Sequence, residues 1–94
     1  MEPGVFHVRS ATDLQPADGY ACSVEAVCRA RTRAEATVLL RACDVGGFSA
    51  RTVAPVRSAA DTTELELPAL APDEVWVRTT AVPGSWRRRR PRPR

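Results

Sequence analysis

The residues best suited to binding chemistry are six arginines within the last eight positions, residues 87–94. Such a run could neutralise about five or six phosphates and so bind nucleic acid in a sequence-independent, strongly salt-dependent way. It could equally bind an acidic surface of a partner protein. A third interpretation is a solvated run that reflects biased codon usage, because the chain contains no Lys, Ile or Asn. The candidate binding residues of this segment are Arg87, Arg88, Arg89, Arg90, Arg92 and Arg94.

Aromatic side chains offer a second kind of binding chemistry, because exposed rings can stack against sugars. Trp76 and Trp86 are the candidate platforms. Phe6, Tyr20 and Phe48 fit the inward rows of the strands predicted below, so we expect them in the core. Carbohydrate recognition through the two tryptophans is therefore an alternative to binding through the arginines.

The sequence offers little for catalysis or metal binding. His7 has no second His or Cys-x-x-Cys spacing to complete a site, so we expect a plain surface or rim histidine. Asp44 and Asp61 could line a calcium site, but Asp near Gly is typical of turns. Glu64 and Glu66 could act as paired carboxylates, yet outward glutamates on a strand are usually solvated. No phosphate loop, nucleophile elbow or zinc motif occurs. We expect a non-catalytic protein without metal or cofactor.

Charge is unevenly distributed along the chain. Residues 1–86 carry eight Arg against eleven Asp and Glu, a formal charge of −3, whereas residues 87–94 carry six Arg and no acid. The sequence therefore predicts an acidic body with a basic tail, in which the tail is not one stripe of a larger basic face.

Targeting and redox signals are weak. No run of about 18 apolar residues could span a membrane, and residues 1–4 lack the features of a signal peptide, so we expect a virion or cytoplasmic location. Cys22 and Cys28 would lie about 20 Å apart on one strand, too far for a disulfide. Cys28 and Cys43 could pair, but we favour reduced thiols in the core.

Alternation with a period of two predicts strands through most of residues 20–82. One row contains Tyr20, Cys22, Val24, Ala26, Cys28 and Ala30, and the other contains Ser23, Glu25, Arg29 and Arg31. We predict strands at residues 5–9, 20–31, 36–43, 48–53, 63–67 and 74–82, with residues 10–19 as a loop and residues 44–47 as a hairpin turn. A helix over residues 23–40 is the alternative, because Ala, Glu and Arg favour helix.

These elements predict an all-β fold, a small antiparallel β-sandwich over residues 1–82. Residues 83–94 would form a separate tail rich in Arg and Pro. Like charges repel one another and Pro favours extended chain, so we expect this tail to be disordered or bound to a partner.

Motifs spread over residues 14–82 resemble a carbohydrate-binding-module-like jelly roll. They are Leu14-x-Pro16-x-x-Gly19-Tyr20, Cys28-Arg29-Ala30, Ala36-Thr37-Val38-Leu39-Leu40-Arg41, Asp44-x-Gly46-Gly47, Thr63 to Leu67 and Val75-Trp76-Val77-Arg78. Such modules occur in glycosidases and in tail and other virion proteins of phages that infect GC-rich actinobacteria. A rival resemblance is the fibronectin type III domain, since Leu70-x-Pro72-x-x-x-Trp76 is similar to the corner before its penultimate strand.

The jelly-roll resemblance implies a non-catalytic structural or binding module. The first interpretation is a phage virion accessory protein (decoration, connector or tail) that its arginine tail anchors to an acidic protein surface. The alternatives are a stand-alone carbohydrate-recognition module and a sequence-nonspecific nucleic-acid-binding accessory protein. No membrane partner is expected, and an exposed sheet edge would allow a homo-oligomer.

Overall fold

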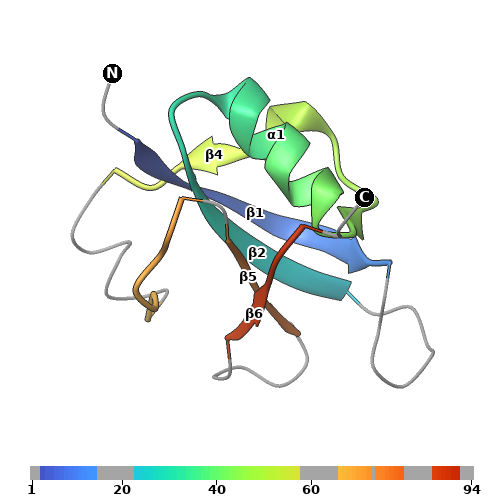
Figure 1. Ribbon diagram of the computed structural model, residues 1–94. Coiled ribbons are helices and arrows are strands. Elements are labelled where there is room, and N and C mark those ends of the chain that lie inside the picture. The colour runs from blue at the N-terminus through green and yellow to red at the C-terminus, as the bar shows by residue number, and fades with distance from the viewer. Residues whose placement is uncertain (1–2, 15–22, 58–65, 73, 80–85, 92–94) are drawn as a thin grey trace.

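Among the residues that the structure describes, six strands form one curled antiparallel sheet, and a helix packs on one of its faces (Figure 1). The computed structural model describes residues 3–14, 23–57, 66–72, 74–79 and 86–91. The elements in chain order are β1 (Gly4–Asp13), β2 (Ser23–Ala30), α1 (Arg33–Ala42), β3 (Val45–Gly46), the 3₁₀ helix η1 (Ala50–Thr52), β4 (Ala54–Pro55), β5 (Val75–Thr79) and β6 (Arg87–Arg89).

The sheet has the strand order β3-β1-β2-β5-β6, and β4 also pairs with β1. Strands β3 and β4 pair with opposite ends of β1, at Thr12 and Asp13 and at Phe6 and His7 respectively. The prediction of a small antiparallel β domain is confirmed. However, the described residues form one sheet covered by a helix, not the two stacked sheets of a sandwich.

The predicted alternation is confirmed in β2 and β5, the two central strands. In β2 the row of Val24, Ala26, Cys28 and Ala30 is buried in the core that α1 covers, whereas Ser23 and Arg29 are exposed. In β5 Val75 and Val77 join the same core, so Trp76 and Arg78 lie on the other side. We call the side that faces α1 the inner face and the other side the outer face. Tyr20 and Cys22 lie outside the described residues.

Strand β1 contains a bulge that changes which residues face inward. Its pairing with β2 moves from Val8 opposite Ala26 to Ala11 opposite Val24, so Arg9 and Ser10 together oppose the single residue Glu25. Both bulge residues are exposed, and Ala11 and Asp13 then point inward. The extra residue reverses the alternation, because side chains on a strand have a period of two. Residues 10–13 were predicted as loop, and this assignment was wrong.

The predicted strand at residues 36–43 was also wrong, because most of this segment belongs to α1. Thr32 caps the helix by accepting a hydrogen bond from the backbone N–H of Glu35 (3.1 Å). Ala36 and Leu40, one helical turn apart, are buried against the sheet, whereas Val38 is exposed. Helix α1 therefore supplies the apolar layer that a second sheet would supply in a sandwich.

The segment after α1 differs from the predicted hairpin between two strands. Asp44 adopts a positive φ of 63° as the chain leaves the helix, and β3 follows at once. Gly47 has the same φ. The segment predicted as a strand over residues 48–53 contains η1 at Ala50–Thr52 instead, and β4 follows it at Ala54–Pro55. A strand was also predicted at residues 63–67. Residues 63–65 lie outside the described ranges, and Glu66 and Leu67 do not belong to a strand.

The C-terminal arginines form part of the sheet. Arg87–Arg89 constitute β6, which pairs with β5 in the register Val75 with Arg89, Trp76 with Arg88 and Val77 with Arg87. The expectation of a disordered tail is therefore corrected for these three residues. The proposed boundary at residues 82 and 83, together with Arg92 and Arg94, lies outside the described residues.

Candidate functional site

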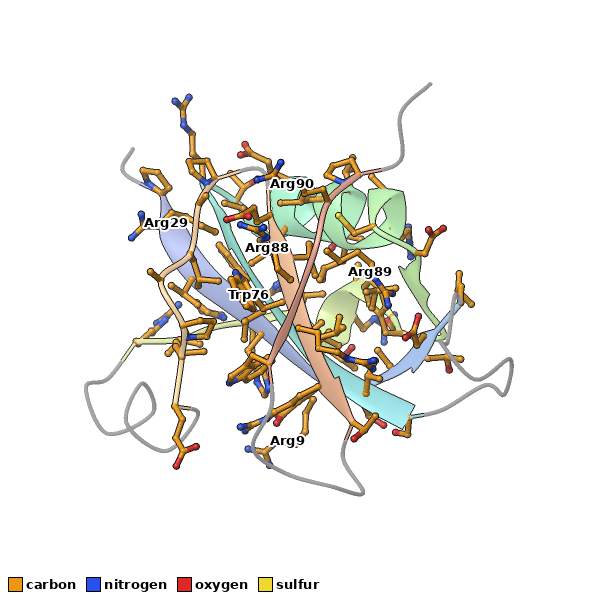
Figure 2. All side chains as sticks on the ribbon, turned by 60° about the horizontal axis from the view of Figure 1, so that its bottom comes forward. Arg9, Arg29, Trp76, Arg88, Arg89 and Arg90 are labelled. Atoms are coloured by element: carbon orange, nitrogen blue, oxygen red, sulfur yellow. The ribbon has the colours of Figure 1, made fainter. Side chains whose placement is uncertain are left out.

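Strand β6 separates its arginines between the two faces of the sheet. Because Arg88 lies opposite Trp76, it belongs to the outer face, whereas Arg89 lies opposite the core residue Val75. Figure 2 shows Arg88 and Trp76 together near the middle of this face, with Arg90 and Arg29 toward one end and Arg9 toward the other. The arginine run therefore consists of residues with different roles.

Arg89 has a structural role. Its Nη1 and Nη2 donate hydrogen bonds to Oδ1 and Oδ2 of Asp13, at 2.6 and 3.0 Å. The Asp13 side chain is completely buried. These hydrogen bonds raise the pKa of Arg89, although burial acts in the opposite direction. Arg89 thus fastens β6 to β1 and is not available to a partner.

Arg88 and Arg90 form a different arrangement around Glu74, which immediately precedes β5. The Nε atoms of both arginines approach the same carboxylate oxygen, Oε2, at 3.2 and 3.7 Å. The arginine side chains are 53% and 66% exposed, whereas that of Glu74 is 8% exposed. Two exposed cations therefore share one buried anion.

A second polar cluster lies further along the outer face. Glu25 accepts a hydrogen bond from Arg78 Nε and lies 2.9 Å from His7 Nε2. The Arg78 guanidinium lies over the Trp86 ring, 4.3 Å from its centroid. Burial alone would raise the pKa of Glu25, but its hydrogen bonds and charge interactions with His7 and Arg78 lower it overall. This cluster joins β1, β2 and β5 to the residue that precedes β6.

The two tryptophans are not open platforms. Both side chains are half-buried, and the Arg78 guanidinium covers part of one face of Trp86. The Nε1 atom of Trp76 is buried without a hydrogen-bond partner among the described residues. His7, which was expected to be a plain surface or rim histidine, is half-buried and paired with Glu25.

The exposed charge of the described residues is strongly positive, which the sequence had not indicated. Of six acidic side chains in these ranges, only Glu35 and Glu66 are exposed, because most of the others are turned inward or paired with arginine. Ten arginines are exposed: Arg9, Arg29, Arg31, Arg33, Arg41, Arg51, Arg57, Arg87, Arg88 and Arg90. The remaining acids are Glu2, Asp18, Asp61, Glu64 and Asp73, outside the described ranges. Within the described ranges, arginines beyond the terminal run therefore contribute to a larger basic surface.

Sequence reasoning missed the carboxylates that organise this site: Asp13, Glu25 and Glu74. A partial signal was present for Glu74, because it shares the outer row of its strand with Trp76 and Arg78. Nothing local marked Asp13, since its inward position depends on the bulge and its partner is far away in the chain.

Other kinds of site are not evident in the described ranges. No group of three or more His, Cys, Asp or Glu side chains there could hold a metal ion. No helix in these ranges has the length and apolar character needed to cross a bilayer. Cys28 and Cys43 are buried free thiols, and Cys22 is not among the residues described.

Comparison with protein-family models gives no match. Comparisons with curated proteins and with solved structures give no match either.

Proposed function

We propose that this chain is a non-catalytic binding module that binds nucleic acid through the phosphate backbone. Its contact surface would be the outer-face arginines of β6 and its flank, Arg88 and Arg90, together with Arg29 and Arg9. The observation that carries the proposal is the excess of exposed arginines over exposed acids in the described part of the chain.

This distribution favours a polyanion because electrostatic attraction to phosphate is summed over many contacts and does not depend on base sequence. Ten of the twelve arginines among the described residues are exposed, whereas most of the acids there are buried or paired. A rigid strand that presents Arg88 beside the arginines of other strands also lowers the entropy cost of binding relative to a disordered tail.

The proposal is tested by fluorescence anisotropy with labelled single-stranded and duplex oligonucleotides of random sequence over a range of salt concentrations. We expect binding that weakens steeply with salt and differs little between sequences. The variants Arg88→Gln and Arg90→Gln should each reduce the slope of log K against log salt by about one. Arg51→Gln in η1, outside the proposed surface, is the matched control and should change the slope less. Absence of binding at low salt would contradict the proposal.

A second candidate function is attachment to an acidic surface of a larger protein assembly, such as a phage virion. It is favoured by the place of β6 at the end of the strand order, where its outer edge has no strand partner among the described residues. An extended acidic segment could pair with such an edge. Co-purification with a protein partner that survives nuclease treatment would favour this candidate over nucleic acid.

A further inference from the structure

We propose that Arg88 and Arg90 form a phosphate-binding pair that the Glu74 carboxylate occupies in the free protein. Binding would then exchange this internal carboxylate for a phosphate group of the ligand. This inference rests on the proposed function, because it assigns a specific site and a built-in competitor to the surface described above.

The contacts of Glu74 are electrostatic but incomplete. Oε2 lies 3.2 Å from Arg88 Nε and 3.7 Å from Arg90 Nε, yet it is buried and has no hydrogen-bond partner in the described part of the chain. A carboxylate in good bidentate geometry would accept two hydrogen bonds from a guanidinium group. The ion pairs around Glu74 therefore hold the two arginines near one another but leave Oε2 without a hydrogen-bond partner in the described part of the chain.

Arg89 differs from Arg88 and Arg90 in how its side chain is held. Arg89, between the two arginines of the pair, makes two hydrogen bonds to a completely buried aspartate. Arg88 and Arg90 are more than half exposed, so a ligand can reach them from solvent. Arg89 is therefore held by Asp13, whereas Arg88 and Arg90 can exchange their contact with Glu74 for a contact with a ligand.

The strand register adds a third arginine to this site. Cys28 pairs with Val75, and Val75 pairs with Arg89. The next position in this register is Arg29 in β2, Glu74 immediately before β5 and Arg90 immediately after β6. These three residues therefore continue one row across the outer face. Arg29 is exposed, and Figure 2 shows it toward the same end of the sheet as Arg90. Two cations thus pair with one buried carboxylate and a third lies in its row, so the positive charges outnumber the carboxylate and could bind a phosphodiester.

The test measures how Glu74 affects affinity for two phosphate polymers, a short labelled oligothymidylate and inorganic polyphosphate as competitor. Glu74→Gln removes the internal anion, and Glu66→Gln makes the same change in net charge at an exposed residue that forms no ion pair with Arg88 or Arg90. We expect Glu74→Gln to tighten oligothymidylate binding about fivefold, and Glu66→Gln to tighten it less than about twofold, because exposed charges interact weakly. Polyphosphate should compete more strongly with Glu74→Gln than with wild type by a similar factor.

Equal effects of the two substitutions on affinity, or weaker binding by folded Glu74→Gln, would overturn the exchange while leaving the proposed function intact. Failure of wild type and both variants to bind either polymer would overturn both. Circular dichroism and urea denaturation establish that the variants are folded. If Glu74→Gln is unfolded, Glu74→Asp withdraws the carboxylate by one methylene group. It should tighten binding by about twofold, and unchanged affinity in that variant would overturn the inference.

Discussion

Asp13 and Arg89 lie 76 positions apart in the chain and meet through two charge-assisted hydrogen bonds of 2.6 and 3.0 Å. They connect β1 to β6, which are separated by β2 and β5 in the strand order. This contact is possible because the sheet curls (Figure 1). Arg89 Nη1 also lies 3.5 Å from the Cys43 carbonyl oxygen at the end of α1, so the same side chain contacts the helical layer.

Replacing Arg89 should therefore destabilise the whole domain. In Arg89→Ala, Asp13 loses its guanidinium partner while its side chain remains buried, which costs about 3 kcal/mol in the free energy of unfolding. Arg87→Ala, in the same strand but with an exposed side chain, should cost less than about 0.5 kcal/mol. Urea denaturation of the two variants provides the measurement, and equal stabilities would refute the structural role of Arg89.

The Glu25 cluster predicts a loss of stability in acid. The pKa of Glu25 in the folded protein lies below its ordinary value of 4.5. The ionised Glu25 carboxylate therefore stabilises the folded protein fully at pH values above 4.5. This stabilisation is lost as the pH falls through the lower pKa that Glu25 has in the folded state. We expect Glu25→Gln to be less stable than wild type near neutral pH, and the difference to shrink in acid. Urea denaturation at a series of pH values tests this, and a difference that does not change with pH would argue against it.

Gly47 and Gly4 should differ in how much stability is lost when each is replaced by Ala. Gly47 has a φ of 63°, and a Cβ there would clash with the Thr12 side chain, so Gly47→Ala should cost about 1–3 kcal/mol in stability. A Cβ at Gly4 would meet no atom within 4 Å, and Gly4→Ala should be neutral or stabilise by up to about 1 kcal/mol. Thermal denaturation distinguishes the two, and similar melting temperatures would contradict the conformation of Gly47.

The Cys28 thiol should be unreactive in the folded protein. Burial, with smaller contributions from Cys43 and Glu35, raises its pKa to about 12, so almost no thiolate exists near neutral pH. In a Cys22→Ser, Cys43→Ala variant, a thiol reagent should react slowly until urea unfolds the chain. Rapid reaction under native conditions, in a variant shown to be folded, would place Cys28 outside the core.

The central part of the fold could be predicted from sequence because its signals are local. Val24, Ala26 and Cys28 occupy every second position of β2, and Val75 and Val77 do the same in β5. One face of each strand is a row of small apolar residues, which is the pattern that alternation detects, although Val27 and Arg78 on the outer face are also buried. The faces of both strands were therefore predicted correctly.

Helix α1 was missed because two kinds of signal competed. The β-branched Thr37 and Val38 favour strand, but Thr32 and Glu35 have the spacing of a helix cap, and Ala36 and Leu40 have that of a helical face. The structure places Val38 on the exposed side of the helix, where its propensity costs little. Greater weight on capping and helical spacing would have identified the helix.

Strand β6 could not be predicted because its partners are distant. A run of arginines with prolines has the composition of a disordered segment. Here the edge of β5 supplies backbone partners and Asp13 supplies a buried anion. Neither partner can be inferred from residues 87–94 themselves, and the same holds for the contacts of Arg88 and Arg90 with Glu74.

The bulge at Arg9 and Ser10 means that this stretch of β1 is constrained in length more than in composition. Many side chains would be tolerated at two exposed positions. Losing one residue, by contrast, would shift every later position of the strand by one and turn Asp13 toward the opposite face. Insertions and deletions at this point should therefore be rarer in natural variants than amino-acid replacements.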